Sequence, residues 1–212
     1  MDLGHIVQLH IPKTGGSALR AALRGTGAYR WGHSYVLGPR LEGDHYVVPY
    51  QRPGRPDGVA AHRDDFTYHV GQPTPEQRFL VTVRDPVKRF ISAYAWSRDR
   101  LAHRGYPDAD SLARDLNDEA LANVVFHPQV DWLICPERLR EPDILWIGHT
   151  ETLAADFERL RAMLGLDDSH QLPAVGDMKR NAGTYSDELS PLGEANVRDW
   201  YAEDIKLLEA IR

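Results

Sequence analysis

The sequence predicts an α/β fold: a single domain, residues 1–212, in which helices flank a central, largely parallel sheet. Two observations predict it. Apolar runs at residues 6–9, 78–84 and 143–148 have the composition of strands that are buried on both faces. Segments with apolar residues at helical spacing follow these runs, and such alternation is typical of parallel sheets. Because ligands of these sheets bind beyond the carboxyl ends of the strands, we expect the functional residues there.

The first predicted strand, residues 6–9, runs directly into a glycine loop and then into a helix. The loop has the sequence His10-Ile11-Pro12-Lys13-Thr14-Gly15-Gly16-Ser17-Ala18. Such a loop presents several backbone N–H groups to one point, which suits a phosphate or a sulfate, so we expect a P-loop-like nucleotide site. Lys13 precedes the two glycines, whereas the lysine follows them in the ATP- and GTP-binding loop G-x-x-x-x-G-K-[ST].

Two weaker strand candidates lie between the first and second of these runs. Residues 38–58 are rich in proline and glycine, which predicts irregular structure with one short strand at 45–48. Residues 58–62 form a second short candidate made mostly of small side chains. The segment 38–58 does not predict a domain boundary, because too few residues precede it to form a separate domain.

The helix after residues 78–84 has a clear start. Asp85 is a good N-cap, and Pro86 suits the first helical position. The residues expected on its buried face are Val87, Phe90, Ile91 and Tyr94. Lys88 and Ser92 point away from that face on a helical wheel of about 100° per residue.

Two further helices are predicted in the last third of the chain. The first carries an apolar stripe of Leu153, Phe157, Leu160 and Leu164. The second is a single last helix that begins near Ser190 and Pro191 and includes Leu208. The residues expected to be buried in it are Val197, Trp200 or Tyr201, Ile205 and Leu208. We expect Trp146 and Trp200 to serve packing.

Composition limits the classes of function. The 212 residues are 42% hydrophobic and 26% charged, and no apolar run approaches the roughly 20 residues of a membrane span. A net charge of −6 argues against a nucleic-acid partner, so any anion site must be local. The single cysteine, Cys135, excludes an intramolecular disulfide and predicts a reducing, cytoplasmic setting.

Arg84 and Ser92 form a second candidate anion site. Arg84 ends a buried strand, and Ser92 lies about two turns into the following helix. A guanidinium fork and a hydroxyl together can hold a phosphate. The spacing alone favours a different interpretation, in which Arg84 pairs with Asp85 or another carboxylate and Ser92 is a solvated helix residue.

Two segments together resemble the sulfotransferases that use 3′-phosphoadenosine-5′-phosphosulfate, especially the carbohydrate branch with the heparan sulfate 2-O-sulfotransferases and bacterial relatives. The segments are Pro12-Lys13-Thr14-Gly15-Gly16-Ser17 and Val83-Arg84-Asp85-Pro86-Val87-Lys88-Arg89-Phe90-Ile91-Ser92-Ala93-Tyr94. The resemblance implies that the first segment binds the 5′-phosphosulfate, through Lys13, Thr14, Gly15, Gly16, Ser17 and Ala18. It implies that Arg84 and Ser92 bind the 3′-phosphate.

Other segments are similar to the same branch. Ala61-His62 resembles its Gly-His motif, whose histidine is the catalytic base, with Ala61 in place of glycine. His127-Pro128-Gln129 resembles an Asn-Pro-Gln segment, with His127 in place of asparagine. The segment 147–151, which leads into the Leu153 helix, also fits, whereas residues 95–122 contribute nothing to the resemblance.

The residues fit sulfuryl transfer to a hydroxyl acceptor. Negative charge grows on the departing phosphate oxygen, and a cation such as Lys13 stabilises it more in the transition state than in the ground state. The acceptor hydroxyl loses a proton as it attacks, and the neutral imidazole of His62 can accept it. The scheme requires no divalent metal, and the resemblance implies that the acceptor is a sugar hydroxyl.

Several alternatives remain open. His62 also fits a structural histidine; His10, beside the loop, is the rival base, and His33 and His69 are further candidates. Arg180 fits a late nucleotide contact or a solvated loop residue. At the level of function, the alternatives are a nucleotide kinase or NTPase that needs Mg²⁺, and a non-catalytic nucleotide-binding protein.

Overall fold

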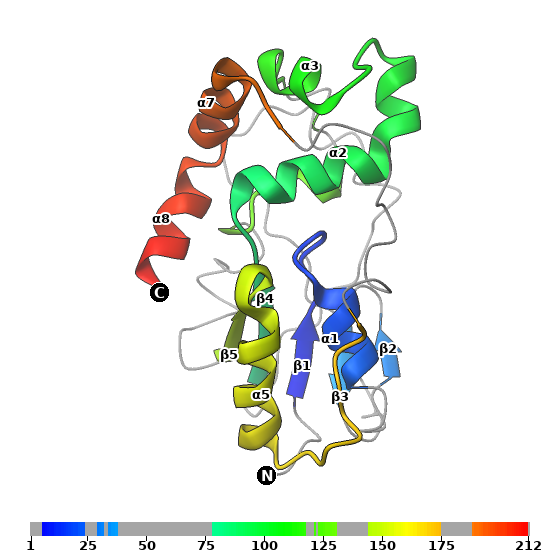
Figure 1. Cartoon of the computed structure of the whole chain (residues 1–212), viewed down its shortest axis with the longest axis vertical. Coiled ribbons are helices and arrows are strands. Elements are labelled where there is room, and N and C mark those ends of the chain that lie inside the picture. Colours follow the sequence, from blue (N-terminus) through cyan, green and yellow to red (C-terminus); the bar gives the residue numbers. More distant parts are fainter. Residues whose placement is uncertain are drawn as a thin grey trace. The chain divides into compact units, whose positions relative to one another are not determined.

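The computed structural model describes residues 6–23, 29–31, 34–37, 78–117, 121, 123–130, 144–174 and 188–211. The chain forms two compact units (Figure 1). Unit 1 comprises Met1–Tyr50, Tyr68–Val83 and Trp132–Met178. Unit 2 comprises Gln51–Thr67, Arg84–Asp131 and Lys179–Arg212. The assignment of residues 1–212 to one domain stays a prediction.

Unit 1 contains a five-stranded sheet with the strand order β2-β3-β1-β4-β5. Its strands are β1 (Ile6–Leu9), β2 (Tyr29–Trp31), β3 (Ser34–Leu37), β4 (Arg78–Val83) and β5 (Ile144–His149). β4 pairs in parallel with both β1 and β5, so the α/β class is confirmed, and the three predicted strands form its parallel part. β3 pairs antiparallel with β1 and β2, so the sheet is mixed.

The antiparallel edge of the sheet was not predicted. β2 and β3 pair so that Trp31 lies opposite Ser34, with only two residues between the strands. Strands of three and four residues give too little alternation to stand out in a sequence. The strands predicted at 45–48 and 58–62 lie outside the described residues.

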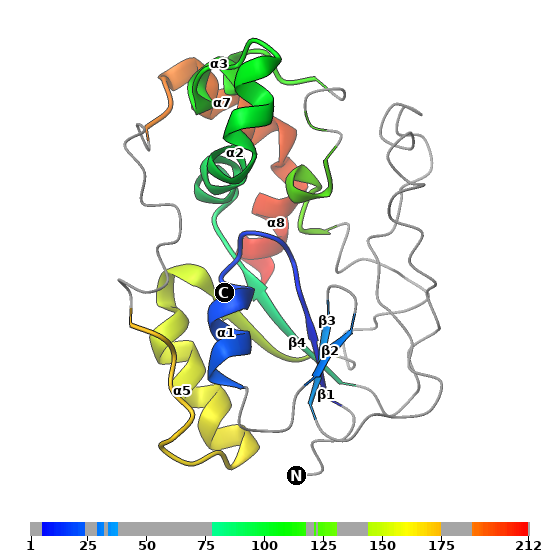
Figure 2. The ribbon, with the colours of Figure 1, turned by 90° about the vertical axis from the view of Figure 1, so that its right-hand side faces the viewer.

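Two helices pack on one face of this sheet (Figure 2). They are α1 (Gly16–Ala22) and α5 (Leu153–Leu164), and a 3₁₀ turn, η7 (Thr150–Thr152), precedes α5. The predicted stripe of α5 is buried and joins a core with Leu19, Leu80 and Trp146. Each fully buried leucine or phenylalanine stabilises such a core by about 1.5–3 kcal/mol.

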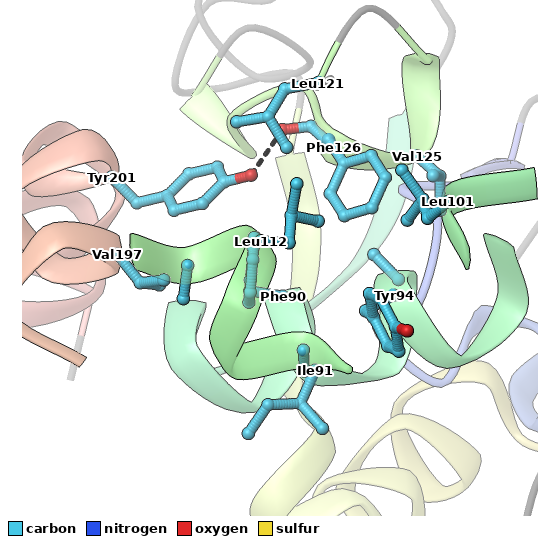
Figure 3. Packing of buried hydrophobic residues seen from close by; sticks show 13 residues of the cluster. Phe90, Ile91, Tyr94, Leu101, Leu112, Leu121, Val125, Phe126, Val197 and Tyr201 are labelled. Atoms are coloured by element: carbon cyan, nitrogen blue, oxygen red, sulfur yellow. Dashed lines mark hydrogen bonds between the residues drawn. The ribbon is translucent and has the colours of Figure 1, made fainter. Parts of the chain in front are cut away.

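Unit 2 is helical in its described part. Its elements are α2 (Pro86–His103), α3 (Ala109–Arg114), η5 (Val124–Phe126), α7 (Pro191–Trp200) and α8 (Ala202–Ala210). Their core includes Phe90, Tyr94 and Phe126 (Figure 3). The rings of Phe90 and Phe126 are 5.8 Å apart and tilted by 54°, a favourable aromatic geometry.

The predicted helix starts of unit 2 are confirmed. The Asp85 carboxylate accepts the Lys88 N–H at 3.0 Å at the start of α2, with Pro86 in the first position. The Ser190 hydroxyl accepts the Gly193 N–H at 3.2 Å at the start of α7.

The sequence predicts one continuous last helix, and this prediction is wrong. Tyr201 separates α7 from α8, with φ −105° and ψ 29°. Its buried hydroxyl donates to the Phe126 carbonyl at 2.7 Å, as Figure 3 shows. This tertiary bond accompanies the break, and helical periodicity gives no sign of it.

Candidate functional site

The Lys13 loop, residues 10–17, begins where β1 ends and leads into α1 (Figure 1). Two of its residues have left-handed backbone conformations: Lys13 with φ 69° and Gly15 with φ 84°. Glycine adopts this conformation freely, but a lysine in it costs about 1–2 kcal/mol. Such strain persists only where the surroundings impose it, and it is typical of functional sites.

The loop presents a row of backbone donors. The N–H groups of Ala18 and Leu19 donate to the Gly15 carbonyl at 2.9 and 3.3 Å. Among the described residues, no acceptor meets the N–H groups of Thr14, Gly15, Gly16 and Ser17. Consecutive N–H groups that follow a left-handed residue form a concave donor array, which suits an anion.

Threonine hydroxyls hold the loop against the sheet. The Thr14 hydroxyl donates to the Ile11 carbonyl at 2.9 Å and lies 2.9 Å from the Thr82 hydroxyl of β4. The Thr150 hydroxyl donates to the Thr14 carbonyl at 2.7 Å and lies 3.0 Å from the Val83 carbonyl. The Thr14 hydroxyl therefore serves the loop itself, which leaves its N–H as the group that a ligand could use.

Gly16 lies against polar side chains from the end of β1. The Gln8 amide donates to the Gly16 carbonyl at 2.7 Å. A Cβ at position 16 would lie 2.7 Å from Nδ1 of His10 and 3.1 Å from Nε2 of Gln8. The His10 imidazole, the rival base, thus packs directly against the loop backbone, and only a glycine fits between them.

A buried carboxylate fixes the turn after β5. Asp156 accepts the His149 N–H at 2.7 Å and the Thr152 hydroxyl at 2.9 Å, and it pairs with Arg159. Burial raises the pKa of the Asp156 carboxyl, but these hydrogen bonds and Arg159 lower it by more, so the pKa lies below its usual value. The turn held in this way carries Thr150, which contacts the Lys13 loop.

The backbone of Arg84 is held by a glutamine side chain in unit 2. The Arg84 N–H donates to Oε1 of Gln129 at 2.8 Å, and Nε2 of Gln129 donates to the Arg84 carbonyl at 2.8 Å. Asp204 of α8 accepts the Gln129 N–H at 2.9 Å and Nε2 of Gln129 at 3.3 Å, and it also accepts the Val130 N–H at 3.0 Å. We call Arg84, Gln129 and Asp204 the Arg84 clasp.

The segment that carries Gln129 is fixed by buried polar side chains. The Arg89 guanidinium, 1% exposed, donates to the carbonyls of Val125 and His127 at 3.1 and 2.7 Å. Tyr201 donates to the carbonyl of the intervening Phe126. Three consecutive carbonyls thus receive hydrogen bonds from α2 and from the α7–α8 junction.

Ser92 lies in α2, and its side chain is half-buried. Phe90, Ile91 and Tyr94 are buried and Lys88 is exposed, as the helical wheel predicted. The role of the Ser92 hydroxyl in binding a phosphate stays a prediction.

The predicted site residues are divided between the units. Lys13, Thr14, Gly15, Gly16, Ser17 and Ala18 lie together in unit 1, whereas Arg84 and Ser92 belong to unit 2. His62, the predicted base, lies outside the described residues, as do His33, His69 and Arg180. Sequence analysis assigned no role to Thr150, Gln129 or Asp204, although Thr150 and Gln129 both lie in segments that carry the resemblance.

Comparison of the sequence with known proteins gave neither a matching family model nor a matching curated protein. Within the described ranges, no cluster of three or more His, Cys, Asp or Glu side chains could hold a metal ion. No helix in the same ranges has the length and apolar character that a bilayer crossing needs.

Proposed function

We propose that this protein transfers a sulfuryl group from 3′-phosphoadenosine-5′-phosphosulfate to a hydroxyl, for which the resemblance suggests a sugar acceptor. In this reaction a bond forms between sulfur and the acceptor oxygen as the bond from sulfur to the phosphate oxygen breaks. The acceptor proton passes to a base, and adenosine 3′,5′-bisphosphate leaves.

The observation that carries the proposal is the donor array of the Lys13 loop. The N–H groups from Thr14 to Ser17 provide four donors without acceptors among the described residues, and they suit the oxygens of a phosphosulfate. Lys13 belongs to the same turn, and its ammonium group would stabilise the charge that develops on the departing oxygen. The left-handed backbone of Lys13 supports a functional role for this residue.

Arg84 and Ser92 would bind the 3′-phosphate. The Arg84 guanidinium would supply a charge-assisted fork, and the Ser92 hydroxyl one further donor. The clasp supports this role for Arg84, because both backbone groups of the residue are held. The base in this scheme is His62, which removes the acceptor proton.

The direct test is transfer of labelled sulfate from the donor to a panel of sugar acceptors without added Mg²⁺. We expect label on at least one acceptor and loss of transfer in His62→Ala. Tight nucleotide binding without transfer to any acceptor favours the non-catalytic alternative. Preference for ATP with Mg²⁺ favours a kinase or an NTPase.

Calorimetry tests the nucleotide site separately. Adenosine 3′,5′-bisphosphate should bind more tightly than adenosine 5′-monophosphate, and Arg84→Ala should remove the difference. Arg98→Ala, at an exposed position of α2, is the matched control and should preserve it. Equal affinities in the unmodified protein would remove Arg84 and Ser92 from the proposal.

A further inference from the structure

We infer that Gln129 and Asp204 are positioning residues that set the selectivity of this protein for a 3′-phosphorylated nucleotide. They act through the Arg84 backbone and touch no ligand themselves. The inference rests on the proposed function, because it assumes that Arg84 binds the 3′-phosphate.

The Gln129 amide substitutes for a neighbouring strand at the point where β4 ends. Arg84 is the first residue after β4. Its N–H and its carbonyl both bond to the one Gln129 amide, at 2.8 Å each, as paired residues do in a sheet. The backbone from which the Arg84 side chain projects is therefore fixed beyond the last residue of the strand.

Asp204 decides which way the Gln129 amide faces. The Asp204 carboxylate accepts three N–H donors, and one of them is the amide nitrogen of Gln129, which faces Oδ2 at 3.3 Å. With the nitrogen on that side, Oε1 is left for the Arg84 N–H. The same carboxylate accepts the N–H groups of Gln129 and Val130, which fixes the backbone of the amide as well.

The hydrogen bonds that hold residues 125–127, the segment before Gln129, do not involve the Gln129 side chain. Arg89 and Tyr201 hold the carbonyls of residues 125–127 from other elements. A Gln129→Met substitution therefore removes both bonds to Arg84 and leaves those three carbonyls held. The methionine has a similar length and neither donates nor accepts a strong hydrogen bond.

Selectivity is the property that distinguishes positioning from simple stabilisation. A substitution that only destabilises unit 2 weakens the binding of both nucleotides by the same factor, so the ratio of their affinities stays constant. A displaced Arg84 side chain weakens the binding of only the nucleotide that carries a 3′-phosphate. The informative quantity is therefore Kd for adenosine 5′-monophosphate divided by Kd for adenosine 3′,5′-bisphosphate.

The experiment measures this ratio by calorimetry in the full chain and in three variants. We expect Gln129→Met to lower the ratio about tenfold, the effect of losing one hydrogen bond to a charged group. Asp204→Asn should lower it in the same direction, because an asparagine no longer forces the orientation of the amide. Tyr201→Phe, which removes a buried bond to the same segment, should leave the ratio unchanged.

A double variant completes the test. In an Arg84→Ala background, Gln129→Met should produce no further change in the ratio, because the side chain through which it acts is absent. Should Gln129→Met not fold, as judged by circular dichroism, the more conservative Asp204→Asn decides the outcome. If the unmodified protein prefers the bisphosphate, and Gln129→Met and Asp204→Asn keep the same ratio of Kd values, this inference is overturned but the proposed function is not. A parent ratio near one would overturn the proposed function, and the inference with it.

Discussion

The Lys13 loop and the Arg84 clasp each depend on a buried carboxylate that accepts backbone N–H groups, but the two carboxylates reach their partners differently. Asp156, which supports the loop through the turn after β5, accepts an N–H from His149, seven residues before it. Asp204, which supports the clasp, accepts N–H groups from residues 75 and 74 positions away. The turn that contacts the Lys13 loop is thus held by a local carboxylate, whereas the clasp is held by a carboxylate from a distant segment.

Their remaining partners differ in the same way. Asp156 also receives a hydroxyl from Thr152 and pairs with Arg159, both within four residues of it along the chain. Asp204 receives only N–H groups among the hydrogen bonds of the described residues, and its side chain is fully buried. Removal of Asp204 would leave buried donors without an acceptor. Asp156 is equally buried, but its hydrogen bonds are part-buried and its partner Arg159 is 67% exposed, so water can replace part of what Asp156 provides.

The largest effect is expected at Asp204. Asp204→Ala leaves the donors of Gln129 and Val130 without their acceptor, and we expect it to lower the free energy of unfolding by about 3–5 kcal/mol. Urea unfolding measures the change. Asp199→Ala, an exposed carboxylate of α7, is the control and should change stability by no more than about 0.5 kcal/mol. A similar loss of stability in Asp204→Ala and Asp199→Ala would contradict the prediction that the buried hydrogen bonds of Asp204 stabilise the fold.

The second prediction concerns Lys13. Lys13→Ala should lower the rate of sulfuryl transfer by about 100- to 1,000-fold, the usual cost of removing one group that stabilises transition-state charge. Binding of adenosine 3′,5′-bisphosphate should fall much less. Lys13→Gly separates chemistry from strain, since it should be equally slow yet about 1 kcal/mol more stable than Lys13→Ala, because φ 69° suits glycine. Near-normal transfer by either variant would remove Lys13 from the mechanism.

The contrast between contacts that are local in the sequence and contacts between distant segments also explains which features the sequence could predict. The three parallel strands, the Asp85 and Ser190 caps and the stripe of α5 follow from neighbouring residues, and all were found in their predicted places. The Lys13 loop was recognised because its donors lie side by side in the chain. Each of these features is encoded in one short continuous segment, the longest of which is the 12 residues of α5.

The clasp could not be predicted in this way. Nothing near Asp204 in the sequence of α8 indicates that it contacts Gln129, and the resemblance of residues 127–129 gives Gln129 no hydrogen-bond partner. The buried Arg89 was equally hidden, because an arginine on a helix usually reaches water. The break at Tyr201 has the same origin, since its hydrogen-bond partner lies 75 residues away.

The third prediction uses the pKa of Asp156. Because the folded state holds this pKa below its usual value, ionised Asp156 stabilises the fold above the pKa of the unfolded chain, about 3.9. This stabilisation is lost as the pH falls below that value towards the folded pKa. Asp156→Asn should cost about 2 kcal/mol at pH 7 and flatten the loss of stability between about pH 5 and 3. Unfolding curves across this range measure both effects.

Asp110 is the matched comparison in unit 2. Hydrogen bonds from the Ser190 hydroxyl and N–H lower the pKa of the Asp110 carboxyl, and Arg114 adds to the effect. Asp110→Asn should therefore flatten the same part of the pH profile without affecting the Lys13 loop. An unchanged acid profile in Asp156→Asn would show that Asp156 does not supply this stability.

The smallest effect is expected at Thr150, and it tests the link between the turn and the loop. Its hydroxyl donates to the Thr14 carbonyl at 2.7 Å, so Thr150→Val should remove this part-buried hydrogen bond and lower stability by about 1 kcal/mol. Valine keeps the shape of the side chain, so it creates no cavity. Thr150→Ser keeps the hydroxyl and should retain the bond. The Thr14 carbonyl belongs to the peptide group that also carries the Gly15 N–H, a donor to the 5′-phosphate in the proposed site. Because both nucleotides carry this phosphate, the valine variant should weaken the binding of the bisphosphate and of the monophosphate by the same factor. A change in their ratio would instead place the effect at the Arg84 clasp.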